Sequence, residues 1–534
     1  MIDCAIKLQQ LLFECGEPSR RALVEHIPLN KTRYKICVYR NHSFELIEHT
    51  ISAYLDFADS LSSFVYSDYD DSLSFINFDQ TADMAIVWLD LARYSHSGSI
   101  SDFISERLKV LSSKFDKPIL FASCGGEVFI DDPNVITFDI DSLSAKFGAK
   151  LYDERMECIS GTRLSSKAMM AVAKEMGLKY IPSMLRTPLK AIVVDLDNTL
   201  YKGVLGEDGI LGVQLTDGHK HLQKTLKHLK EQGFFLSIIS KNDIEDVLEL
   251  FDNRHDFPLK KDDFVSIQAS WEEKSVLMSN VLSFLNIHYD SVVFVDDNLG
   301  ELNMMDMKYR DIHCIKACDD AFVTANVVEA YPRLRKFKLN IEDTLRAKDS
   351  MANAQRESLK NDLSPKEYLK SLDVNIRFGV DESTTVDRVV ELANKTNQFI
   401  FNYRRYNNAQ ITHMIEDEQS VVITISLKDK LSDSGIIGVV TAYLENGTVV
   451  IDEIFVSCRA LGRGLDDIIV LGALSLACKA LDSNKVKVLF KKGERNVPAE
   501  NFACEKLNEY LQNAADFEYE FPKEIVNIEV KGRI

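Results

Sequence analysis

Residues 193–199 read Val-Val-Asp-Leu-Asp-Asn-Thr, and this heptapeptide decides how the middle of the chain is interpreted. The apolar run that begins at Ala191 predicts a short buried strand, which delivers Asp195 and Asp197 to its end. In open α/β sheets, ligands bind just outside the carboxyl ends of strands. Two acids this close repel each other unless a divalent cation, or a protonated partner, relieves the repulsion. The pair alone fits a strand-end turn as well as a catalytic site.

Polar groups also follow the other strands that the sequence predicts in this segment. In chain order they are Ser240, Lys241 and Asn242 after residues 234–239, Lys274 after residues 264–267, and Asp296, Asp297, Asn298 and Glu301 after residues 291–295. Parallel strands would bring these groups to one edge of a sheet. Each group alone fits a structural role, but the ordered set favours a phosphoryl-transfer site over a series of turns.

Length and composition describe a globular protein of several domains. The chain has 534 residues, of which 46% are hydrophobic and 27% charged, and the length favours about three domains. The net charge of −19 argues against nucleic acid or an anionic membrane as a main partner. The ten cysteines are scattered, and we expect no signal peptide and a reducing, cytoplasmic location.

The pattern of apolar runs divides the chain into three α/β segments. Predicted strands in the first segment are 35–39, 63–66, 84–88, 118–122 and 135–138, with helices at 43–61 and 101–115 between them. The second segment has strands at 190–194, 234–239, 264–267 and 291–295, with helices at 218–232 and 273–285. A helical stretch at 342–361 leads to strands at 375–378, 420–426, 435–445 and 448–456 and a helix at 465–481. We place the domains at 1–182, 183–345 and 346–534, with a parallel sheet in the first two and an α+β fold in the last.

The second segment resembles the haloacid dehalogenase (HAD) superfamily of phosphotransferases, through Asp-Leu-Asp-Asn-Thr, Ser240, Lys274 and Asp296-Asp297. The resemblance implies a Rossmann-like three-layer domain in which Asp195 attacks phosphorus and Asp197 acts as acid and base. Ser240 and Lys274 would hold the phosphoryl oxygens. Candidate substrate contacts here are Thr199 and Asn242. Mg²⁺ would be bound by Asp195, the backbone carbonyl of Asp197, and Asp296, with Asp297 as a further ligand or a support. Residues 203–209 predict a short flap rather than a separate cap domain.

In the third segment, Ser457-Cys-Arg-Ala-Leu-Gly-Arg-Gly464 lies between a strand and a helix, and Arg459-x-x-Gly462-x-Gly464 is similar to the pyrophosphate loop of GNAT acetyltransferases. Glycines let a backbone approach phosphate, and the following helix N-terminus favours anions. Asn496-Val-Pro-Ala-Glu-Asn-Phe502 also looks like a late GNAT helix. The resemblance implies coenzyme A, or the phosphopantetheine arm of a carrier protein, as the ligand.

The order of these motifs, with Lys395-Thr-Asn-Gln-Phe399 between them, resembles the FkbH-like proteins over roughly residues 35–510. That resemblance implies a phosphatase/acyltransferase of polyketide biosynthesis that loads a glyceryl unit from 1,3-bisphosphoglycerate onto an acyl carrier protein. Cys458 would be the acyl-carrying thiol, and Arg459 and Arg463 would lower its pKa. A small buried strand-end residue is the structural alternative for Cys458. An acidic carrier would need local basic residues. The candidates are Arg404, Arg405, Arg459, Arg463, Lys491, Lys492 and Arg495, which would otherwise form a solvated basic rim.

The chain also departs from the family pattern. The first segment would be SGNH-hydrolase-like, but it lacks a Gly-Asp-Ser nucleophile block, and we expect Asn41-His-Ser43 to cap a helix in a non-catalytic scaffold. Tyr201-Lys202 stands where the family often has Trp-Gly, and Phe401-Asn-Tyr precedes Arg404, so the acyl substrate can differ. Two other functions remain open. One is a stand-alone phosphatase of sugar or surface-polysaccharide synthesis acting on a phosphorylated small molecule, and the other is a non-catalytic assembly protein.

Overall fold

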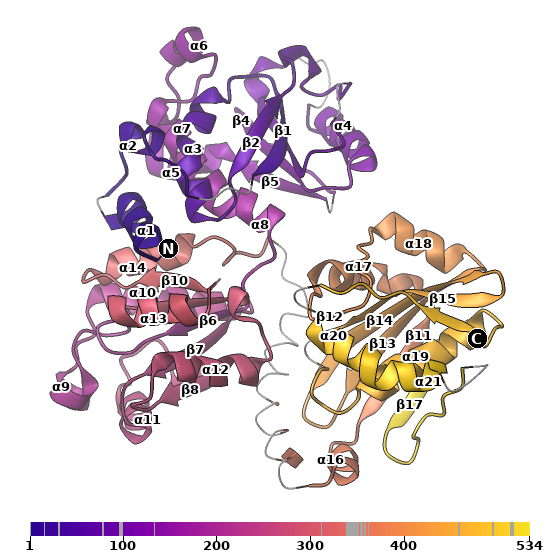
Figure 1. Cartoon of the computed structure of the whole chain (residues 1–534). Helices are drawn as coiled ribbons and strands as arrows, with labels where there is room; N and C mark the ends of the chain where they lie inside the picture. Colours follow the sequence, from indigo (N-terminus) through magenta and orange to yellow (C-terminus); the bar gives the residue numbers. More distant parts are fainter. Residues whose placement is uncertain are drawn as a thin grey trace. The chain divides into compact units, whose positions relative to one another are not determined.

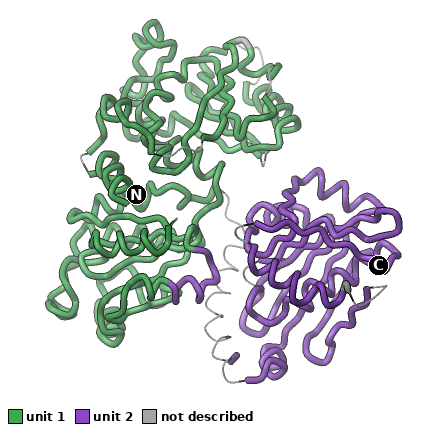
Figure 2. Tube along the Cα trace, viewed as in Figure 1, with its two compact units in different colours: residues 1–278, 289–338 green, residues 279–288, 339–534 purple. Residues whose placement is uncertain are grey.

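The protein, in a computed structural model, divides into two compact units: residues 1–278 with 289–338, and residues 279–288 with 339–534 (Figures 1 and 2). The structure describes residues 2–14, 16–29, 33–76, 79–94, 100–132, 134–310, 312–337, 352, 356, 359–360, 363–457, 460–493, 496–512 and 517–533. The described chain forms two parallel five-stranded sheets and one mixed sheet, which confirms the predicted multidomain α/β class. Both parallel sheets belong to the first unit, so the boundary predicted at residue 182 stays a prediction.

The first sheet has the strand order β2-β1-β3-β4-β5, and all its strands are parallel. Its strands are β1 (Tyr34–Arg40), β2 (Ser62–Tyr66), β3 (Met84–Asp90), β4 (Ile119–Cys124) and β5 (Val135–Asp139). Its helices are α1 (Ile2–Gln9), α2 (Arg20–Val24), α3 (Glu45–Phe57), α4 (Ile100–Lys114), α5 (Ser144–Phe147), α6 (Arg155–Ser160), α7 (Ser166–Glu175) and α8 (Ile181–Leu185). The predicted strands agree with these bounds to within two residues, because each is an apolar run between turn residues.

The second sheet has the order β10-β9-β6-β7-β8 and is also entirely parallel. Its strands are β6 (Ala191–Val194), β7 (Phe235–Ser240), β8 (Ser266–Ala269), β9 (Val292–Asp296) and β10 (His313–Lys316). Its helices are α9 (Leu205–Gly212), α10 (Asp217–Glu231), α11 (Ile244–Asn253), α12 (Lys274–Leu285), α13 (Leu299–Lys308) and α14 (Ala321–Ala330). The strand predicted from the opening heptapeptide, β6, is central and buried throughout, as expected of an apolar strand in a parallel sheet.

The edge strand β10 was not predicted, and the N-terminal helix protects it. The Gln9 side chain donates to the Lys316 carbonyl at 2.9 Å and accepts from the Lys316 N–H at 3.1 Å. This amide therefore pairs with β10 as a further strand would, and it satisfies backbone groups that an edge otherwise leaves open.

The sheet of the second unit has the order β12-β15-β14-β13-β11-β17, with β16 paired to β15. Its strands are β11 (Asn375–Val380), β12 (Phe399–Ile400), β13 (Ser420–Lys428), β14 (Asp433–Glu445), β15 (Thr448–Val456), β16 (Val486–Val488) and β17 (Asn527–Gly532). Its helices are α16 (Pro365–Ser371), α17 (Val386–Lys395), α18 (Asn408–Glu416), α19 (Asp466–Ala480), α20 (Val497–Phe502) and α21 (Asn508–Gln512). The four long strands pair antiparallel, as predicted for an α+β fold. Most of the helix predicted at 342–361 lies outside the described residues.

Within the described part of the chain, none of the helices combines the length and the apolar character that a membrane crossing requires.

Candidate active site

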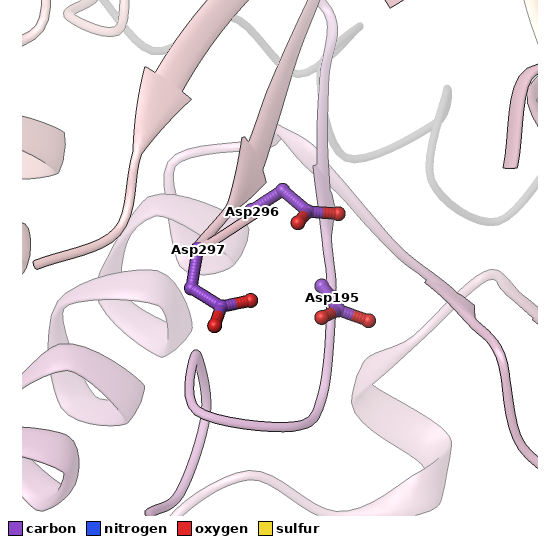
Figure 3. A group of neighbouring side chains, drawn as sticks. All are labelled: Asp195, Asp296 and Asp297. Atoms are coloured by element: carbon purple, nitrogen blue, oxygen red, sulfur yellow. The ribbon is translucent and has the colours of Figure 1, made fainter. Parts of the chain in front are cut away.

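Three carboxylates meet at the carboxyl edge of the second sheet. Asp195 follows β6, Asp296 ends β9, and Asp297 comes directly after it. One oxygen from each lies within 4.8 Å of the others, an arrangement that could hold a metal ion (Figure 3). Carboxylate oxygens are the ligands that Mg²⁺ and Ca²⁺ prefer. We call these three residues the acid group.

The register between β6 and β9 brings the acids together. Val194 pairs with Val295, and the Asp195 N–H donates to the Val295 carbonyl at 2.9 Å. The two strands therefore end side by side, and each places its acids at the same level. This is the proximity that the parallel-strand argument predicted from the sequence.

Lys274 bridges two members of the acid group. Its ammonium lies 2.9 Å from Oδ1 of Asp195 and 2.6 Å from Oδ2 of Asp296, and all three side chains are buried. A buried charge without a partner would be strongly destabilising, so the lysine and the acids stabilise one another. Three ionised carboxylates and one ammonium carry two net negative charges, which a divalent cation would balance.

The pKa values follow from this burial. Burial raises the pKa of Asp195 above its ordinary value, Lys274 opposes the rise, and Asp296 adds to it. Burial also raises the pKa of Asp296 and of Asp297. For Lys274 burial acts in the opposite direction, but the two neighbouring carboxylates outweigh it and raise its pKa. The site therefore favours a charged lysine and opposes full ionisation of all three acids without a further cation.

The side chain of Asp197 is held apart from the acid group by three donors. Oδ1 accepts from the Tyr201 hydroxyl at 2.7 Å and from the Leu205 N–H at 3.0 Å. Oδ2 accepts from the Asn242 amide at 2.9 Å. The carboxylate of Asp197 is not among the three that converge, so the predicted ligand role of its backbone carbonyl stays a prediction.

Ser240 and Asn242 extend the site from the end of β7. The Asn242 amide donates to Oγ of Ser240 at 3.0 Å as well as to Asp197, and both residues are buried. Asn242 thus links two predicted catalytic groups, a role beyond the substrate contact that the sequence suggested. Thr199 is also buried, and its Oγ1 has no hydrogen-bond partner within the described ranges.

Two contacts of the site were not predicted from the sequence, although the residues that make them had been named. Tyr201, noted only as a family departure, is fully buried and bonded to Asp197, and an i+4 spacing from Asp197 is the signal that could have suggested it. Lys241 pairs with Glu301 at 2.6 Å, which ties the turn after β7 to helix α13. The segment predicted as a short flap contains helix α9, in which Gly209, with a φ of +67° and a ψ of 173°, forms a kink; its role as a flap stays a prediction.

The structure describes only part of the glycine-containing loop at residues 457–464 of the second unit. Cys458 and Arg459 lie outside the described residues. Gly462 and Gly464 have φ of +79° and +73°, which favour glycine, and α19 begins two residues later. The prediction that Arg463 belongs to a solvated basic rim is wrong, because this side chain is buried. Its Nη1 lies 3.4 Å from Oδ2 of Asp429.

Other members of that basic set already have partners. Arg404 pairs with Asp452, Lys492 pairs with Glu500, and Arg405 donates to the Thr396 carbonyl and to the Asn397 side chain. Arg495 lies outside the described part of the chain, and Lys491 donates its backbone N–H to the Phe401 carbonyl.

In the first sheet, the residues Asn41-His-Ser43 do not cap α3, whose N-cap residue is Phe44. The Asn41 side chain joins β1 to β3 through the backbone of Asp90. Its amide NH₂ donates to the Asp90 carbonyl at 3.0 Å, and its Oδ1 accepts from the Asp90 N–H at 2.8 Å. Ser43 donates to Glu45 at 2.6 Å. The expected cap is therefore wrong, because these side chains stabilise the strand ends and the first helical turn in other ways.

No family model and no curated relative matches the sequence. Among solved structures, the chain is similar to the N-terminal part of a Bacteroides fragilis protein containing a phosphatase domain complexed with Mg. That likeness has 19% identity and a TM-score of 0.45, and it covers 59% of this chain and 98% of that one. A probable YrbI family phosphatase from Pseudomonas syringae matches with 19% identity and a TM-score of 0.20, over 27% of this chain and 85% of that one.

A ribosomal-protein-alanine N-acetyltransferase from Brucella melitensis matches with 14% identity and a TM-score of 0.19. It covers 27% of this chain and 95% of that one.

Proposed function

We propose that the first unit is a Mg²⁺-dependent phosphatase of the HAD type, acting on a phosphorylated small molecule. The observation that carries the proposal is the acid group with Lys274 between two of its members. A turn-capping pair of acids would not need a buried lysine or acids from a second strand. Asn242 and Ser240 add neutral hydrogen-bonding groups at the same edge.

The donor set fits Mg²⁺. Asp195, Asp296 and Asp297 offer three hard oxygen ligands, and the net negative charge of the acid group and Lys274 matches a divalent ion. When bound, the ion would neutralise phosphate charge and so reduce its repulsion from the nucleophile.

The protein side chains supply the remaining chemistry. An oxygen of Asp195 attacks phosphorus, the bond from phosphorus to the leaving oxygen breaks, and Asp197 donates a proton to that oxygen. Asp197 then takes a proton from water as the water attacks phosphorus and releases Asp195. Ser240 and Lys274 bind the phosphoryl oxygens, where charge develops.

Phosphate release tests this proposal. With Mg²⁺ and a panel of phosphosugars and acyl phosphates, we expect the wild type to turn over at least one substrate. Asp195→Asn, which keeps the shape of the side chain, should lower kcat by a factor on the order of 10³ or more. Asp252→Asn, an exposed change in α11, is the matched control and should leave kcat unchanged. Equal rates for wild type and Asp195→Asn would exclude Asp195 as the nucleophile.

A second candidate couples this chemistry to acyl transfer onto an acyl carrier protein. The observation that favours it is the pair of left-handed glycines, Gly462 and Gly464, directly before α19. Against anion binding there, α19 carries Asp466 and Asp467 in its first turn, where carboxylates already complement the helix dipole. The proposed roles of Cys458 as acyl carrier and of Arg459, Gly462 and Gly464 in binding the phosphopantetheine arm are therefore separate from the phosphatase proposal.

Intact-mass spectrometry of a phosphopantetheinylated carrier separates the two functions. The carrier is incubated with the protein, Mg²⁺ and 1,3-bisphosphoglycerate. A glyceryl adduct that disappears in both Asp195→Asn and Cys458→Ala would support coupled acyl transfer. Phosphate release from phosphosugars without any adduct would identify a stand-alone phosphatase, and an adduct that persists in Cys458→Ala would exclude the thiol.

A further inference from the structure

The second unit contains a groove of about 550 Å³ between α18 and the strands β13, β14 and β15. Helix α18 packs on β13. The floor includes Tyr406 and Asp452, and Tyr443 lies beside them. This volume is within the range of small-molecule sites, and the groove belongs to neither of the functions proposed above.

A bulge in β15 directs Asp452 into this groove. Thr441 of β14 pairs with Glu453, and the next residue, Ala442, pairs with Ile451, so Asp452 is the extra residue. Bulges turn a side chain away from the regular alternation of a strand and are common next to binding sites. Asp452 is 5% exposed, and it lines the groove.

One oxygen of this buried carboxylate is fixed and the other is available. Oδ2 accepts from the Tyr406 hydroxyl at 2.7 Å and from Nε of Arg404 at 3.1 Å. The Tyr406 hydroxyl also contacts Oγ1 of Thr441 at 2.9 Å. Within the described ranges, Oδ1 of Asp452 has no hydrogen-bond donor. Oδ1 is not among the fully buried polar atoms that lack a partner, so it is open to the groove and offers a ligand one charged acceptor at the floor.

The loop that carries Arg404 is rigidly held. The buried carboxylate of Glu453 accepts from the backbone N–H groups of Phe401, Asn402 and Arg404 at 2.7–2.8 Å. The Asn402 side chain donates to the Asp452 carbonyl at 3.1 Å. The loop and the bulge therefore hold each other in place, and the groove is formed before any ligand binds.

The rim of the groove presents hydrogen-bond donors. Asn407 and Gln410 form a capping box at the start of α18, in which each side-chain oxygen accepts from the other residue's backbone N–H. Their amide NH₂ groups stay available as donors. The Arg404 side chain is 59% exposed and adds a guanidinium. The other acid of the groove, Asp417, already accepts from the Gln419 N–H and the Ser420 hydroxyl, both at 3.0 Å.

We propose that this groove binds a small hydroxylated organic acid of the sugar-acid class. A ligand hydroxyl donates to Oδ1 of Asp452, and the ligand carboxylate accepts from Arg404, Asn407 and Gln410. The rings of Tyr406 and Tyr443 provide apolar faces for the carbon chain. A ligand amine would donate to Asp452, but it cannot accept from the hydrogen-bond donors at the rim. A hydroxylated acid has groups for both the floor and the rim, so it matches the groove better.

Isothermal titration calorimetry of the full chain tests the proposal with three probes of one carbon skeleton: gluconate, glucitol and glucosamine. We expect saturable binding that is tightest for gluconate. Asp452→Asn removes the charged acceptor and should weaken gluconate binding about tenfold or more. Gln410→Glu keeps the capping box but places a negative charge at the rim, so it should weaken gluconate more than glucitol.

Glu445→Gln, an exposed change at the end of β14, is the matched control and should bind gluconate like the wild type. Gln410→Glu lies on the surface and keeps a test available if Asp452→Asn does not fold. The proposal is overturned by absence of gluconate binding, by tighter binding of glucosamine than of gluconate, or by unchanged gluconate affinity in both groove variants. Because calorimetry measures binding to the groove, the result does not depend on whether the first unit is a phosphatase.

Discussion

A single hydroxyl, that of Tyr201, gives the sharpest test of the role proposed for Asp197. Tyr201→Phe keeps the buried ring, which stacks on Phe257 at 6.0 Å, and removes one of the two donors to Oδ1 of Asp197, leaving the Leu205 N–H. If Asp197 protonates the leaving group, losing this donor should matter most when the leaving oxygen is basic. We expect kcat/KM to fall about tenfold on phenyl phosphate and by less than about threefold on acetyl phosphate.

The comparison of two substrates separates chemistry from damage to the fold. A purely structural role for Tyr201 would lower both rates by the same factor, which would contradict the prediction. Tyr69→Phe, at a tyrosine that is 48% exposed, should change neither rate. Equal melting temperatures of the variants and the wild type would show that the fold tolerates both changes.

At the residue level, the sequence predicted the proximity of groups that chemistry alone selects. Asp195, Ser240, Lys274 and Asp296 were chosen because phosphoryl transfer needs those groups near strand ends, and the structure brings them to one edge, while their catalytic roles stay predictions. Prediction failed where a partner comes from a distant turn. Arg463 looked like a solvated cation beside a glycine loop, but Asp429 of the β13–β14 connection lies 3.4 Å from it, and no local pattern reveals that pairing.

At the scale of elements, the first sheet contains a buried histidine that makes its stability sensitive to acid. His42 stacks on Trp88 with ring centroids 4.7 Å apart, and its Nδ1 lies 3.0 Å from Oγ1 of Thr162. Burial lowers the pKa of His42 to about 3, well below the ordinary value. As the pH falls, His42 is therefore protonated in the unfolded chain before it is protonated in the folded chain. The unfolded state gains the proton, so the protein loses stability as the pH falls from about 6.5 towards about 3.

Through the protonation of His42 alone, lowering the pH from 7 to 5 should reduce the free energy of unfolding by about 2 kcal/mol. Urea titrations followed by tryptophan fluorescence at the two pH values measure the difference. In His42→Gln the loss on acidification should be smaller by that amount, whereas His228→Gln, at a side chain that is 68% exposed, should behave like the wild type. An unchanged loss in His42→Gln would show that His42 is not responsible.

Element prediction depended on apolar runs and failed where they are short or absent. Strands β6, β7 and β9 are continuous buried runs, and their positions follow from the sequence. β17 was missed because most of its residues are exposed, and β10 because it has only four residues with one buried. The edge position of β10 becomes clear only once Gln9 is seen to cover it.

For the whole molecule, the two units should respond differently to metal. The acid group lies entirely in the first unit, so Mg²⁺ should stabilise that unit and leave the second unchanged. The chain has two tryptophans, Trp88 and Trp271, and both belong to the first unit. Tryptophan fluorescence therefore follows unfolding of the first unit, whereas far-UV circular dichroism follows both.

After removal of metal with EDTA and re-addition of Mg²⁺, we expect the fluorescence transition to move to higher temperature. A ligand at a hundred times its dissociation constant adds about 2.7 kcal/mol to stability. Asp296→Asn should abolish the shift, because it removes one of the three carboxylates, whereas Asp252→Asn in α11 should retain it. A Mg²⁺ shift that survives in Asp296→Asn would place the metal elsewhere, since loss of a buried ligand at this site must weaken binding.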